Sequence, residues 1–238
     1  MERNRPLVED GIQFYRRHLP HWQPDWAYVF VTYRLAGSLP ARVLAELREE
    51  RERLMAEPMR PDETEDAKRA RIRKHIFNQF DNALDTAPSP KWLGDPRVAA
   101  MIRDNLRHWN GKYYDLRRYV IMPNHVHILI QPLPAGQARN GQARQPVLQC
   151  WPLRNIMQTL KGYTAREANR LLGRKGAFWQ DENYDHWVRN EAEGRRIVHY
   201  IDANPVRAGL CAYSDDWEWS SAFEERDVGQ AVQPVGKA

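Results

Sequence analysis

The sequence has few cysteines and no long apolar run, and these absences exclude several classes of protein. Only Cys150 and Cys211 occur among its 238 residues, too few for a disulfide-stapled scaffold or for a zinc site built from cysteines. No apolar stretch approaches the roughly 18 residues that span a bilayer. The charged residues 1–5 are not followed by the apolar segment of a secretory signal. We therefore expect a cytoplasmic protein without membrane contact.

The short motifs of several large enzyme classes are also missing. The chain contains no GxxxxGK[ST] phosphate loop, no dinucleotide-binding GxGxxG and no GxSxG serine elbow. Its eight histidines form neither an HExxH nor an HxE…CxxC zinc pattern. These absences argue against nucleotide hydrolysis, hydride transfer, serine hydrolases and zinc hydrolases or deaminases.

The composition is that of a globular chain with a basic segment. Apolar residues make up 42% and charged residues 28%, with a net charge of +5, which is enough apolar material for a core. Residues 137–176 hold eight basic residues and one acidic residue, a net charge of +7. Such a segment favours a polyanionic partner such as nucleic acid. On charge alone, a solvated helix face explains it equally well.

Apolar periodicity and turn residues predict a mixed chain of strands and helices. Strands are expected at 27–34, 114–122 and 125–131, with a short one near 177–180. Helices are expected at 38–57, 68–83, 95–111, 152–172 and from 190 to about 204, where Pro205 should end the last one, with a flexible loop at 132–148. The order β-α-β-β-α-β with an extra helix suits a small antiparallel sheet with helices packed on it.

Two histidines on one predicted strand could bind a metal. His125 and His127 are two residues apart, so on a strand they point to the same face. Neutral imidazoles arranged in this way suit one divalent metal ion. Two surface histidines on an exposed sheet face are the alternative.

Tyr200 and Asn204 form a second notable pair, on the last predicted helix. Four residues apart, they share one helix face. A phenol can act as a covalent nucleophile, and an asparagine can offer its carbonyl oxygen to a metal. A core tyrosine beside a helix-ending asparagine is the more common use of such a pair.

Together these motifs resemble the REP-associated tyrosine transposases, a branch of the HUH superfamily of single-tyrosine transposases. The resemblance covers about residues 14–223. It is carried by His125–His127 after Met122–Asn124, and by the runs Phe178–Gln180, Tyr184–Asn190, Tyr200–Leu210 and Trp217–Ser221.

The resemblance implies an α+β fold with a ferredoxin-like HUH nuclease core, an antiparallel sheet with flanking helices. It implies that His125, His127 and Asn204 bind Mg²⁺ or Mn²⁺ and that Tyr200 is the nucleophile. The implied reaction cleaves and rejoins single-stranded DNA at palindromic repeat hairpins through a 5′-phosphotyrosine. Tyr163, on the basic helix after the histidines, is the rival nucleophile.

The resemblance also frames the domain and DNA-contact predictions. We expect one domain over 14–223, a charged helical insertion at 41–92 and a flexible tail at 224–238. The partner is single-stranded or hairpin DNA, bound by a monomer or a homodimer. Expected DNA contacts are Lys161, Arg166, Arg170 and Arg189 to phosphates and Trp179 to a base.

Two other functions stay open at this point. One is a catalytically silent DNA-binding protein of the same fold that recognises repeats. The other is a metal-binding structural or RNA-processing protein with a ferredoxin-like core.

Overall fold

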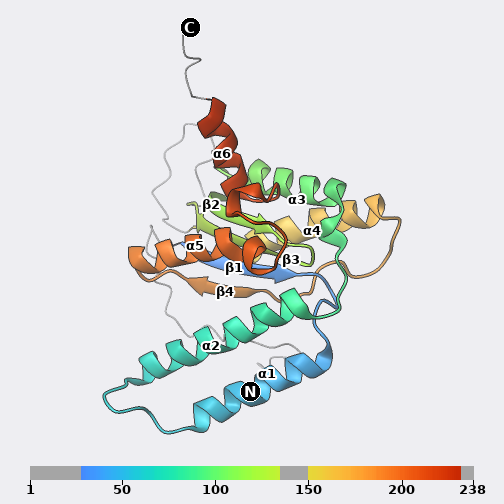
Figure 1. Cartoon of the computed structure of the whole chain (residues 1–238). Coiled ribbons are helices and arrows are strands. Elements are labelled where there is room, and N and C mark those ends of the chain that lie inside the picture. The colour runs from blue at the N-terminus through green and yellow to red at the C-terminus, as the bar shows by residue number, and fades with distance from the viewer. Residues whose placement is uncertain (1–27, 135–149, 232–238) are drawn as a thin grey trace, which may run out of the picture. The chain divides into compact units, whose positions relative to one another are not determined.

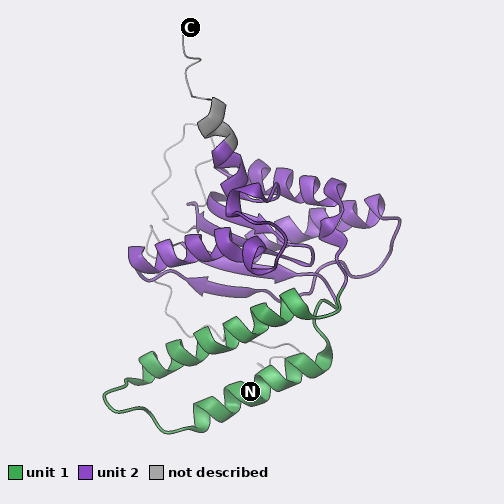
Figure 2. Cartoon of the chain, viewed as in Figure 1, with its two compact units in different colours: residues 1–18, 37–89 green, residues 19–36, 90–238 purple. Residues whose placement is uncertain are grey.

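The structure is a computed structural model that describes residues 28–134 and 150–231, with side chains described as far as Arg226. Its described residues form two compact units (Figure 2). The first comprises residues 37–89, and the second comprises residues 28–36, 90–134 and 150–231. Among the described helices, none is long and apolar enough to cross a membrane.

The second unit is built on a four-stranded antiparallel sheet (Figure 1). Its strands, β1 (Val29–Arg34), β2 (Tyr114–Ile121), β3 (His125–Pro132) and β4 (Tyr184–Trp187), lie in the order β2-β3-β1-β4. The main helices are α3 (Pro96–Trp109), α4 (Leu153–Leu171) and α5 (Glu191–Arg207). This is the strand order of a ferredoxin-like β-α-β-β-α-β unit, which confirms the expected α+β fold with an antiparallel sheet and flanking helices.

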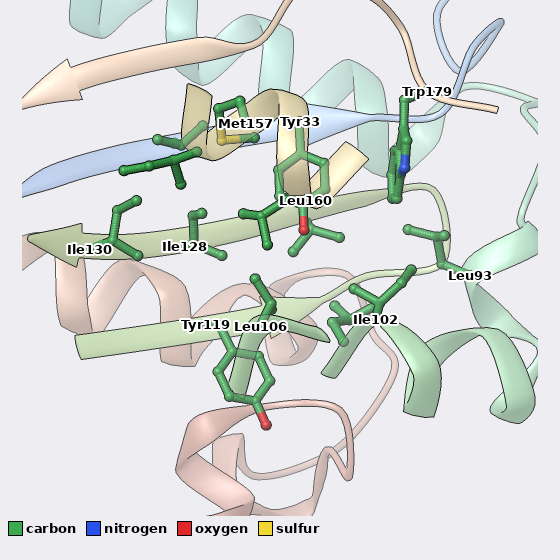
Figure 3. Close-up of a cluster of buried hydrophobic side chains, with 14 of the residues drawn as sticks. Tyr33, Leu93, Ile102, Leu106, Tyr119, Ile128, Ile130, Met157, Leu160 and Trp179 are labelled. Carbon is green, nitrogen blue, oxygen red and sulfur yellow. The ribbon is translucent and has the colours of Figure 1, made fainter. Parts of the chain in front are cut away.

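One face of the sheet carries the main hydrophobic core. Alternate residues of a strand point to opposite faces, so Val31 and Tyr33 of β1 share a face with Ile128 of β3. Helices α3 and α4 cover this face, and their apolar side chains complete the cluster (Figure 3). They include Ile102, Leu106, Met157 and Leu160. The opposite face carries Phe30, Thr32, His125 and His127, and α5 contacts β2 and β3.

The expected signals at the start of α3 are confirmed. The Asp95 side chain accepts a hydrogen bond of 2.9 Å from the Arg97 backbone N–H, and Pro96 occupies the first helical position. The aspartate satisfies one of the backbone donors that lack a partner at a helix start, and Pro has no such donor to lose.

Two expected boundaries are wrong. The expected strand near 177–180 is only an isolated bridge between Leu35 and Trp179, and the fourth strand is Tyr184–Trp187. The segment around Trp179 pairs with the chain just after β1 and then turns before β4 begins. Helix α5 continues through the buried Pro205 to Arg207, and the Ala208 N–H bonds to the Asn204 carbonyl at 3.0 Å. Tertiary burial here outweighs the local bias against a helical residue before proline.

The two remaining loop predictions fall partly on undescribed residues. Of the loop expected at 132–148, residues 135–148 lie outside the described residues. Of the tail expected at 224–238, residues 224–231 belong to helix α6 (Ser221–Ala231). Within α6, Glu224 is ion-paired with Arg107 and accepts a hydrogen bond from Tyr119. Residues 232–238 lie outside the described part of the chain.

The first unit is a pair of helices, α1 (Ala41–Ala56) and α2 (Glu65–Thr86), packed against each other. Thr64 caps α2 by accepting a hydrogen bond from the Ala67 N–H. The Lys68 ammonium donates to the Met55 carbonyl at 2.7 Å and to the Glu57 carbonyl, which ties the start of α2 to the end of α1. This unit covers most of the 41–92 segment expected to be an insertion, which stays a prediction.

Leu106→Ala tests the core beneath α3. Leu106 is fully buried, so the substitution should lower the free energy of unfolding by about 2–5 kcal/mol. The control is Leu210→Ala, the same change at a side chain that is 38% exposed, which should cost less than about 1 kcal/mol. Urea denaturation followed by tryptophan fluorescence measures both. Equal losses would contradict this assignment of the core.

Candidate active site

His125 and His127 occupy successive positions on one face of β3, the sheet face opposite the main core. The β1–β3 register pairs His125 with Arg34 and His127 with Thr32. Both imidazoles are completely buried. The strand period predicted their common face, and the structure adds that this face is not open to solvent.

Hydrogen bonds hold the two rings so that their Nε2 atoms face each other. His125 Nδ1 donates to Asn124 Oδ1 at 2.7 Å, and His127 Nδ1 lies 2.7 Å from Thr32 Oγ1. The two Nε2 atoms are 3.0 Å apart. In metal sites, bonds of this kind to the far ring nitrogen fix the tautomer and the orientation of a ligand histidine. The pair is thus oriented in the way that ligation of one ion requires.

Helix α5 brings Asn204 to the same point. Its side chain is fully buried, with the amide nitrogen 3.2 Å from His127 Nε2. Asn204 Oδ1 has no hydrogen-bond partner among the described residues. Because rotation of the amide by half a turn exchanges its O and N, Asn204 can present an oxygen to the two Nε2 atoms. Two imidazole nitrogens and one amide oxygen can therefore converge on one ion.

Tyr200 lies one helical turn before Asn204 and packs directly on this cluster. Its ring centroid is 5.5 Å from that of His127 and 5.9 Å from that of Phe30. The Arg207 guanidinium carbon lies 5.3 Å from the centre of the Tyr200 ring. A phenol, a positive charge and potential metal ligands therefore share one site.

Comparison with known proteins gives this site a context. No protein-family model matches the chain. A Haemophilus influenzae protein named "Putative REP-associated tyrosine transposase" is 29% identical over 114 residues, and the REP-associated tyrosine transposase of Escherichia coli is 25% identical over 126 residues. The resemblance to the REP-associated tyrosine transposases is confirmed.

The extent of these matches is limited. They cover 48% and 51% of this chain, and the chain spans 61% of the length of each curated relative. A solved structure of a REP-associated tyrosine transposase bound to a REP hairpin superposes with a TM-score of 0.49 at 16% identity. That superposition covers 94% of this chain and 90% of the solved one.

The two tyrosines that the sequence offers as candidate nucleophiles lie on opposite sides of the sheet. Tyr163 lies on α4, which packs on the core face of the sheet, and its side chain is 45% exposed. The histidines point to the opposite face, where Tyr200 contacts His127. This arrangement favours Tyr200 over Tyr163.

Two of the five residues expected to contact DNA instead make contacts within the protein. Trp179 is buried beside Tyr33 (Figure 3). It also contacts Phe178, and its Nε1–H donates to Thr164 Oγ1 at 2.9 Å. It therefore does not offer a face to a base, and this expectation is wrong. Lys161 donates to the carbonyls of residues 180 and 181 at 2.6 and 2.7 Å. Its ammonium holds a loop instead of reaching into solvent.

The other three expected contacts are exposed. Arg170 pairs with Glu167 at 2.9 Å on the outside of α4, and Arg166 and Arg189 are exposed. These arginines remain candidates for phosphate contact, since such contacts need only an accessible cation.

Sequence reasoning missed Thr32 and Arg207 as members of the site. Thr32 is the single threonine or serine within the strand Val29–Arg34, and that isolation was a usable signal. Arg207 stands seven residues after Tyr200 in the run that carried the resemblance, a spacing that returns it to the same helix face.

The structural role of Lys161 predicts a pH effect on stability. Burial lowers the pKa of Lys161 from 10.5 to about 8, so the unfolded chain binds more protons than the folded one between these values. The free energy of unfolding of the wild type should therefore rise from pH 8 to pH 10.5 relative to that of Lys161→Met. Urea denaturation of both proteins across this range measures the difference. A difference that stays flat or falls would refute the burial of this charge.

Proposed function

We propose that the chain cleaves and rejoins single-stranded DNA at palindromic repeat hairpins, with Tyr200 as the nucleophile. One observation carries the proposal: the Tyr200 ring packs on His127, whose Nε2 lies 3.0 Å from that of His125 and 3.2 Å from the Asn204 amide. The names of the curated relatives support the same reaction class.

A divalent cation, Mg²⁺ or Mn²⁺, is part of the proposal. The donor set fits it, because the two oriented imidazoles face one point and the Asn204 amide, whose oxygen has no described partner, can turn that oxygen toward it. When bound, the cation supplies Lewis-acid polarisation of a phosphate oxygen. His125, His127 and Asn204 would hold it.

The proposed chemistry is an in-line displacement at phosphorus. The Tyr200 oxygen forms a bond to phosphorus and loses its proton, while the bond from phosphorus to the 3′ oxygen breaks and that oxygen takes up a proton. The product is a 5′-phosphotyrosine and a free 3′-hydroxyl. Because the phosphodiester bond energy is retained in the phosphotyrosine, a 3′-hydroxyl can attack it and rejoin a strand.

The neighbours of Tyr200 support this step by position and charge. Phe30 packs edge-on against the Tyr200 ring, with an interplanar angle of 89°, and so fixes its plane. Arg207 places a cation near the ring, where the negative charge of a DNA phosphate would lie during attack.

Tyr200→Phe should abolish a covalent protein–DNA adduct without unfolding the protein, since it removes only the attacking oxygen. The wild type is incubated with labelled single-stranded oligonucleotides that cover palindromes near its own gene, with Mn²⁺ or with EDTA, and run on a denaturing gel. We expect an SDS-resistant band that depends on Mn²⁺ and is absent for Tyr200→Phe.

Tyr163→Phe is the matched control for that gel and should retain the band. Binding without an adduct on every palindrome and both strands would replace the proposal with a catalytically silent DNA-binding protein. An adduct that persists in Tyr200→Phe and disappears in Tyr163→Phe would move the nucleophile to Tyr163.

Metal binding can be tested without DNA. Titration with Mn²⁺, followed by the loss of the free-ion EPR signal, should show one site that His127→Ala abolishes. Thr32→Val keeps the shape of the side chain but removes the contact with His127 Nδ1, and should weaken binding by about 10- to 100-fold. His199→Ala, an exposed histidine on the same helix as Tyr200, should leave the affinity unchanged. Equal effects at His127 and His199 would remove the metal from the proposal.

A further inference from the structure

A groove of about 880 Å³ runs between α3 and α4, on the outer side of the helix layer that covers the core face of the sheet. Helix α3 lines it with Asp104, Asn105 and Trp109, among others, and helix α4 with Gly162, Tyr163 and Arg166. The volume lies in the range of small-molecule sites. Since the histidines project from the other face of the sheet, this groove is separate from the candidate active site.

Two residues that line the groove each hold a buried polar atom without a partner among the described residues. Asn105 is only 7% exposed, and its Oδ1 has no hydrogen-bond partner among the described residues. The buried Trp109 Nε1–H, one helical turn further along, has none there either. A buried donor or acceptor left unsatisfied costs stability. The wall of the groove therefore contains one acceptor and one donor whose hydrogen bonds the described residues do not complete.

The glycine in the middle of α4 keeps the groove open. A Cβ at Gly162 would meet no atom within 4 Å, so no packing contact within the protein requires glycine there. Glycine is among the least favourable residues in a helix interior. The missing side chain therefore leaves the groove wider at this point, at the cost of helix stability.

An aromatic ring and a cation stand beside Gly162. Tyr163 is 45% exposed, and Arg166 is also exposed. The acidic residue of the groove, Asp104, is paired with Arg103 at 3.0 Å, which leaves a cationic and aromatic surface. Exposed aromatic rings beside cations bind unstacked bases of single strands.

We propose that this groove binds one unstacked base of a single-stranded DNA segment. The base stacks on Tyr163, and its phosphate contacts Arg166. The inference rests on the proposed function only in taking DNA as the polymer. It adds a contact on the side of the sheet away from the reacting phosphate, so that a bound strand is held at two places.

The test measures binding of a fluorescein-labelled ten-nucleotide oligothymidylate to the full chain by fluorescence anisotropy. Tyr163→Ala should raise the Kd by about 5- to 100-fold, because it removes one base–aromatic stack. Tyr163→Phe keeps the ring and should bind the oligothymidylate with the affinity of the wild type. Tyr213→Ala, at an aromatic side chain that is 70% exposed elsewhere, is the matched control and should change nothing.

Gly162→Ala separates the groove from general stability. It should raise the melting temperature by about 2–4 °C, as a helix-interior Gly→Ala change does in a chain of this size, and yet weaken binding of the oligothymidylate. In a parallel experiment, ultraviolet crosslinking of a 5-iodouracil-substituted strand should attach to Tyr163, identified by peptide mass spectrometry.

The outcomes distinguish this inference from the proposed function. Unchanged affinity in Tyr163→Ala, a crosslink confined to other residues, or no binding by the wild type overturns the groove. An effect of Arg166→Ala with none of Tyr163→Ala shows an electrostatic contact only, and also overturns it. The Tyr200 adduct assay is read on the same proteins, and its failure in the wild type counts against the proposed reaction alone.

Discussion

The antiparallel pairing of β1 with β3 is the constraint on which the candidate site depends. It sets Thr32 opposite His127 and so creates the 2.7 Å contact that orients one imidazole. A shift of the register by one residue would turn every side chain of β3 to the other face. His125 and His127 would then enter the hydrophobic core, and Ile128 would face α5. The apolar residues on both faces thus specify the register, and the register specifies the site.

Part of this site follows from local periodicity, and part of it does not. The two-residue spacing of His125 and His127 predicts their common face, and the four-residue spacing of Tyr200 and Asn204 predicts theirs. Neither spacing says which helix covers which face of the sheet. That choice separates Tyr200 from Tyr163, and it depends on the packing of α4 on the core, a tertiary property.

The wrong expectations have similar physical causes. Trp179 lies close to a basic segment, and composition alone does not distinguish a ring that stacks on a base from one that fills a core. Its Nε1–H bond to Thr164 joins residues 15 apart in sequence, which no local pattern reveals. The fourth strand is only four residues long, so its alternation is too brief to position it from the sequence. The prediction fell instead on the segment around Trp179, which forms only an isolated bridge.

Unsatisfied polar atoms in the second unit mark the places where ligands are proposed. One belongs to Asn204, whose amide lies beside the histidines, and two belong to Asn105 and Trp109, which line the α3–α4 groove. Each such atom costs about 1–3 kcal/mol when buried without a partner, a large part of the total stability of a domain. An apolar side chain at Asn105 would avoid that cost. At Asn204, a cation bound as proposed would offset that cost, because it would take the amide oxygen as a ligand.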